Sequence, residues 1–204
     1  FGVASFVDKP TSPFGVTGDY VYQTDLGLTY SEADFQNAVN GLVVRNGSDT
    51  PESQIEALMQ FGLRSSSELG YRAGAAKFVV LATDAPPHVA GDFASAGAND
   101  GDAILDGGGT GEDYPTVAQV KAALDGSGVI PIFAVTAGNE ATYQSLVDQL
   151  GVGIVVTLSS DSSDIIEVIS GAITDVLETV IENAIGTRGA DTIYGNEGVN
   201  TLRG

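Results

Sequence analysis

Apolar residues follow two repeating patterns along this chain, and together these patterns predict an α/β fold. Short apolar runs are typical of strands buried on both faces of a parallel sheet, and they occur at 1–7, 77–84, 129–136 and 153–158. The aromatic and branched residues of 20–28 predict one more strand. Apolar residues spaced three and four apart predict amphipathic helices at 31–42, 51–64, 115–124, 140–150 and from Asp161 or Ser162 onward. Strands that alternate with helices in this way predict a doubly wound, mostly parallel sheet.

Composition narrows the class of protein. The 204 residues, 43% of them hydrophobic, are enough for one α/β domain with a sizeable core. The net charge of -19 argues against binding to nucleic acid or anionic lipid and makes divalent cations the natural partners. No apolar run approaches the roughly 20 residues that a membrane span needs, so we expect no membrane insertion. The absence of Cys excludes disulfides and thiol catalysis, and it is compatible with a secreted bacterial protein that gains order from calcium.

Carboxylates in two loops are candidate ligands for a hard cation, which prefers oxygen donors. Thr50 and Pro51 have the residue types of a helix N-cap and first helical position, which would place Asp49 and Glu52 at a helix N-terminus. Asp84 is the last residue of the predicted strand at 77–84, at the end where open α/β sheets bind their ligands. We therefore expect these three acidic groups to converge on one rim. The alternative is that Asp49 and Glu52 only complement the helix dipole.

Four short motifs, at 5–9, 49–52, 83–85 and 132–136, stand in the order found in integrin β subunits. From residue 1 to about 173 the chain resembles their I-like domain, which has the von Willebrand factor A (VWA), Rossmann-like fold. The resemblance implies a metal-ion-dependent adhesion site (MIDAS) that uses Glu52 and Asp84. It also implies a neighbouring cation site formed by Asp49, the Pro51 carbonyl and Glu52. Mg²⁺ or Ca²⁺ would then bind there, and the partner would be a protein or glycan ligand that presents an acidic group.

The sequence departs from this family pattern at its beginning. The Asp-x-Ser-x-Ser motif that the family carries on its first strand is absent, so we expect that strand and its helix to lie upstream. In the family's strand order, 3-2-1-4-5-6, the first strand is the centre of the sheet. Without it, two strand edges are unpaired. We expect the isolated chain to be destabilised, to self-associate, or to pair its first strand beside the strand at 77–84, and to bind metal weakly.

The composition changes abruptly at residue 186, where glycine-rich units with a period of nine begin. They resemble the haemolysin-type (RTX) nonapeptide, whose glycine turns and Asp side chains hold Ca²⁺ in a parallel β-roll. The resemblance assigns Ca²⁺ ligation to Asp191 and Asn200. We therefore predict an A domain at 1–185, incomplete at its N-terminus, and the start of a calcium-binding repeat array at 186–204.

These patterns favour a metal-dependent adhesion or ligand-binding domain of a secreted or cell-surface bacterial protein that binds calcium. His88, the only histidine, lies in a long irregular segment and is predicted to be a surface residue. A nucleophile, a base and an oxyanion group are not evident together, so we do not expect an enzyme. A structural spacer module and, less favoured, a metal-assisted hydrolase are the alternatives.

Overall fold

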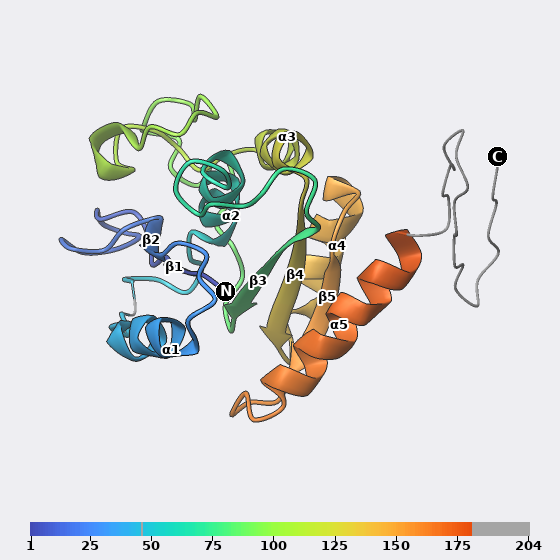
Figure 1. Ribbon diagram of the computed structural model, residues 1–204. Helices are drawn as coiled ribbons and strands as arrows, with labels where there is room; N and C mark the ends of the chain where they lie inside the picture. Colours follow the sequence, from blue (N-terminus) through green and yellow to red (C-terminus); the bar gives the residue numbers. More distant parts are fainter. Residues whose placement is uncertain (46, 181–204) are drawn as a thin grey trace.

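The computed structural model describes residues 1–45 and 47–180, and in them the strands form two sheets (Figure 1). β1 (Val3–Ser5) and β2 (Gln23–Leu26) form an antiparallel pair. β3 (Lys77–Thr83), β4 (Val129–Thr136) and β5 (Ile154–Leu158) form a parallel sheet in the order β3-β4-β5. The predicted α/β class with a parallel sheet is confirmed. Asp191 and Asn200 lie outside the described residues.

Five α-helices are described: α1 (Glu32–Gly41), α2 (Gln54–Leu63), α3 (Val117–Ser127), α4 (Glu140–Leu150) and α5 (Ile165–Val180). In Figure 1, α5 lies across one face of the parallel sheet, and α4 lies on the other side of β5, as a doubly wound arrangement requires. Ser31 caps α1, because its side chain accepts a hydrogen bond from the Asp34 amide. None of the described helices has both the length and the hydropathy needed to cross a membrane.

The main core lies between α2, α3, α4 and the parallel sheet. Phe133 of β4 and Tyr143 of α4 are fully buried there, with ring centroids 5.3 Å apart. Met59 of α2 is fully buried in the same cluster, as its position in the apolar stripe predicts. By contrast, α1 has no buried residue and contacts both strands of the β1–β2 pair.

The start of α2 differs from the prediction. We expected the helix to begin at Pro51 behind a Thr50 cap, but it begins at Gln54 behind Ser53. The backbone of Glu52 is instead paired with the segment after β3: its amide donates to the Pro86 carbonyl at 3.1 Å, and its carbonyl accepts from the His88 amide at 2.8 Å. Asp49 and Glu52 therefore precede the helix, and Glu52 directly precedes its N-cap residue, Ser53.

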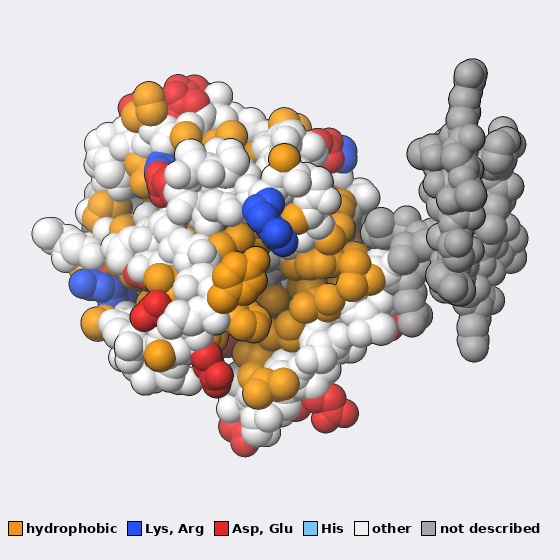
Figure 2. Space-filling model, in the orientation of Figure 1, with side chains coloured by type: hydrophobic (Ala, Val, Ile, Leu, Met, Phe, Trp, Pro, Cys, Tyr) orange, Lys and Arg blue, Asp and Glu red, His pale blue; other side chains and the backbone are white. Residues whose placement is uncertain are grey.

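The two sheets are not joined by a strand ladder in the described part of the chain. β1 pairs with β2 alone, β3 pairs with β4 alone, and the considered pairing of β1 beside β3 does not form. Val80 and Ala82, two residues apart on β3, are also exposed on one face of the sheet, Val80 to 36%. Figure 2 shows one face of the molecule, with hydrophobic side chains gathered in a hollow in its middle, between β3 and α5. The expected unpaired strand edges are therefore present.

Candidate metal centre

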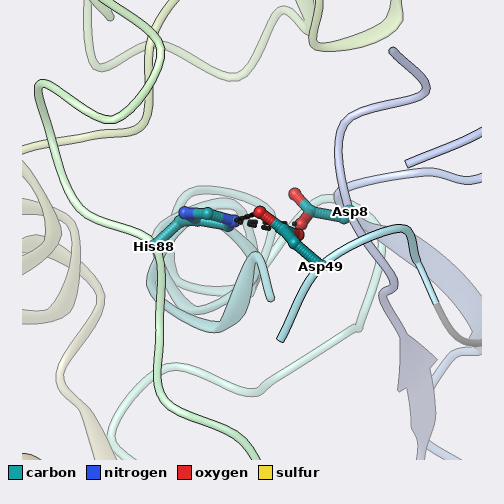
Figure 3. A group of neighbouring side chains, drawn as sticks. All are labelled: Asp8, Asp49 and His88. Atoms are coloured by element: carbon teal, nitrogen blue, oxygen red, sulfur yellow. Dashed lines mark hydrogen bonds and ion pairs between the residues drawn. The ribbon is translucent and has the colours of Figure 1, made fainter. Parts of the chain in front are cut away.

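Asp8, Asp49 and His88 converge from three separate segments of the chain (Figure 3). Asp8 follows β1, Asp49 lies in the loop before α2, and His88 follows β3. The Nε2 atom of His88 lies 3.4 Å from Asp8 Oδ2 and 3.3 Å from Asp49 Oδ2. One ligand atom from each residue lies within 4.8 Å of those of the other two. This spacing is short enough for one metal ion to contact all three residues.

Asp8 is fully buried, and its two carboxylate oxygens have different surroundings. Oδ1 accepts hydrogen bonds from the Lys9 amide, at 2.7 Å, and from the Tyr114 hydroxyl. Oδ2 makes no hydrogen bond and faces His88 and Asp49. A buried charged oxygen without a hydrogen bond is costly, so Oδ2 is a position where a cation would be stabilised.

Glu52 adds a third carboxylate to this region. Burial, together with the negative charges of Asp8 and Asp49, raises the pKa of Glu52 to about 7, and its Oε2 atom makes no hydrogen bond. Gly47, with φ +59, lies against this carboxylate: a Cβ there would lie 3.1 Å and 3.2 Å from its two oxygens. A side chain at residue 47 would therefore be strained and would displace the Glu52 carboxylate.

His88 is buried, with 4% of its surface exposed, so its predicted surface position is wrong. Its Nδ1 atom lies 2.9 Å from Asp92 Oδ2, and its ring stacks on Tyr114 with centroids 4.6 Å apart. Burial lowers the pKa of His88, but its interactions with Asp8 and Asp92 and the negative charge of Asp49 outweigh burial and raise the pKa to about 9. At neutral pH the imidazolium is thus the positive charge among these carboxylates.

Asp84 is not a member of the group formed by Asp8, Asp49 and His88. Its side chain is exposed, while its backbone carbonyl accepts a hydrogen bond from Asn139 Nδ2 at 2.9 Å. Pro51 lies beside Glu52 in the loop that approaches Asp8. Asp8 and His88 were not predicted as site residues. Asp8 stands at the carboxyl end of a predicted strand, and the same position is what made Asp84 a candidate.

Comparison with known proteins gives the family. The profile described as "Integrin beta chain VWA domain" matches residues 1–180. The chain belongs to the integrin β VWA domain family. It is 31% identical over 189 residues to Integrin beta-PS of Drosophila melanogaster, covering 82% of this chain and 22% of the relative. It is 31% identical over 204 residues to Integrin beta-7 of Homo sapiens, covering 88% and 25%, and 33% identical over 196 residues to Integrin beta-2 of Sus scrofa, covering 84% and 25%. The chain thus spans about a quarter of the length of these relatives.

The residues of this integrin β VWA domain fit a hard divalent cation. Hard cations such as Ca²⁺ and Mg²⁺ take oxygen ligands, and Asp8, Asp49 and Glu52 supply carboxylates. The oxygens Asp8 Oδ2 and Glu52 Oε2 are buried without hydrogen bonds, so a cation would offset an existing electrostatic cost. The side chain of Asp49 is 30% exposed, which leaves the site accessible from solvent.

Proposed function

We propose that this chain is a metal-dependent ligand-binding domain in which Asp8, Asp49 and Glu52 hold Ca²⁺ or Mg²⁺, with the Pro51 carbonyl as a further oxygen ligand. The observation that carries the proposal is the pair of buried carboxylate oxygens, Asp8 Oδ2 and Glu52 Oε2, that make no hydrogen bond. The imidazolium of His88 neutralises part of this charge when no cation is bound. A bound cation takes over that neutralisation.

The wider role that we propose is adhesion at a cell surface or in a secreted protein, through a protein or glycan that presents an acidic group. Its support is membership of the integrin β VWA family, whose members are adhesion receptors. Asp84 is exposed at the carboxyl end of β3, where it is available as a ligand of a MIDAS-type site. Binding rather than catalysis is the proposed activity. Binding of a carboxylate-bearing ligand that requires Ca²⁺ or Mg²⁺ would support adhesion, whereas no such binding would favour an inert spacer.

For residues 186–204 we propose the start of an RTX-type repeat array, with Asp191 and Asn200 as Ca²⁺ ligands. The support is the nine-residue period of Gly, Asp or Asn, and aliphatic positions in the sequence. The proposal joins an integrin-β-like domain to a calcium-binding β-roll of a bacterial secreted or surface protein. Calcium titration of the repeat segment, extended by further repeats, tests it, because an array needs several stacked units for stability.

Replacing Glu52 with Gln should weaken cation binding by about tenfold or more. Gln has nearly the same shape as Glu but carries no negative charge, so the variant loses one charged ligand. Isothermal titration of the protein with CaCl₂ and with MgCl₂ measures the effect. Glu32→Gln is the matched control, since Glu32 is an exposed acid in the first turn of α1 and the charge change is the same. If the two variants bind cations with equal affinity, Glu52 is not a ligand and the proposed site is wrong.

A further inference from the structure

Tyr114 connects two members of the candidate metal centre. Its hydroxyl donates to Asp8 Oδ1, and its ring stacks on His88 at a centroid distance of 4.6 Å and an interplanar angle of 18°. The ring is fully buried, and the edge-on ring of Phe14, at 5.5 Å, holds it from another side. The Tyr114 side chain is therefore fixed before any cation arrives.

The hydrogen bond to Asp8 fixes how its carboxylate is oriented toward the site. A carboxylate can rotate about its terminal torsion and present either oxygen. Here the Tyr114 hydroxyl and the Lys9 amide both donate to Oδ1, so Oδ2 is the oxygen directed at Asp49 and His88. The Lys9 amide belongs to the residue next to Asp8 and moves with it. Tyr114, which is 106 residues away in the chain, fixes the carboxylate relative to the rest of the fold.

We infer that Tyr114 is a positioning residue for the cation: it holds Asp8 Oδ2 toward the metal through the other oxygen of the same carboxylate. The inference rests on the proposed cation site. Groups that hydrogen-bond to a metal ligand from behind orient it, and their loss typically lowers metal affinity about 10- to 100-fold. Because the Tyr114 ring also stacks on His88, Tyr114 sets how far the imidazole reaches toward the carboxylates.

Tyr114→Phe is the test, because it removes the hydroxyl and keeps the ring. Tyr143→Phe is a closely matched control: Tyr143 is also fully buried, and its hydroxyl donates to the Ala85 carbonyl at 2.9 Å, away from the three converging side chains. Both variants should lose stability on thermal unfolding with EDTA, because each loses one buried hydrogen bond, and Tyr114→Phe should lose more because its bond is to a carboxylate. Only Tyr114→Phe should weaken Ca²⁺ binding, by about tenfold in calorimetry. If Tyr114 had only a structural role, Tyr114→Phe and Tyr143→Phe would change the Ca²⁺ affinity to the same extent.

Observation of the unaltered protein gives a second readout. With ¹³Cζ-labelled tyrosine, saturating Ca²⁺ should shift the Tyr114 resonance, because ligation of Asp8 Oδ2 draws charge away from Oδ1 and weakens the hydrogen bond from the hydroxyl. The Tyr143 resonance should stay in place. Equal Ca²⁺ affinity of Tyr114→Phe and the unaltered protein, or an unmoved Tyr114 resonance at saturation, would overturn the inference. Absence of Ca²⁺ and Mg²⁺ binding by the unaltered protein would instead refute the cation site on which it rests.

Discussion

Replacing Lys9 with Met should lower the free energy of unfolding by about 3–5 kcal/mol, the usual cost of leaving one partner of a buried ion pair without the other. The Nζ atom of Lys9 lies 2.8 Å from Glu56 Oε2 and 2.8 Å from the Gly109 carbonyl oxygen, and both charged side chains have no exposed surface. The same Nζ atom lies 4.6 Å from the centre of the Tyr114 ring. One ammonium group thus joins the end of β1, α2 and the loop at 106–111.

The loss in the Lys9→Met variant should depend on pH. Burial raises the pKa of Glu56 to about 7, even though the charge and hydrogen bond of Lys9 lower it. An acid whose pKa is higher in the folded than in the unfolded state destabilises the fold as pH rises from the unfolded value toward the folded one. Without Lys9 that pKa rises further. The decrease in the free energy of unfolding caused by Lys9→Met should therefore be smallest near pH 5 and largest near pH 8.

Urea unfolding of Lys9→Met, Glu56→Gln and the double variant at these two pH values measures the effect. The double variant should recover part of the loss, because it buries no unpaired charge. A loss below about 1 kcal/mol for Lys9→Met at pH 8 would show that water reaches this pair.

The isolated chain should also self-associate through the open edge of β3. An unpaired strand edge presents free N–H and C=O groups to other chains, and the exposed apolar side chains of Val80 and Ala82 lie on the same strand. The net charge of -19 opposes association at low ionic strength. Salt screens this repulsion, because the Debye length falls to about 10 Å at 0.1 M and about 3 Å at 1 M. Association should therefore increase with salt.

Sedimentation velocity at low and high salt measures this association. Val80→Lys should shift the protein toward the monomer, since a charge on an edge strand prevents edge-to-edge pairing. Val89→Lys is the control, because Val89 is 43% exposed but lies outside the strands. A protein that stays monomeric at every concentration and salt level would show that the edge is protected. Equal behaviour of the two variants would place the association elsewhere.

The elements with strong local signals could be predicted from the sequence. β4 and α4 have the predicted bounds, because an uninterrupted apolar run and a regular apolar spacing leave little choice of structure. The start of α2 could not be predicted in this way. Thr50 and Pro51 suit a helix start, but two backbone hydrogen bonds from Glu52 to the segment after β3 take precedence, and these join residues far apart in the sequence.

The candidate site was only partly predictable for the same reason. Asp49 and Glu52 share one short loop, so they could be read together. Asp8 and His88 are 80 positions apart, and only the fold brings them to the same place. The burial of His88 depends on the stacked ring of Tyr114 and the edge of Phe14, neither of which is adjacent to it in the chain.

The junction between the two sheets determines how this domain would respond to mechanical load. In the described part of the chain, its backbone hydrogen bonds run from Ser53 to Val7, and between Glu52 and the segment 86–88, instead of along a strand ladder. Tension that separates β1 from β3 is therefore concentrated on a few bonds near one end of each sheet, which break one after another. A cation held by Asp8 and Asp49 would add an ionic cross-link at that end. Calcium concentration would then set the force at which the two sheets separate.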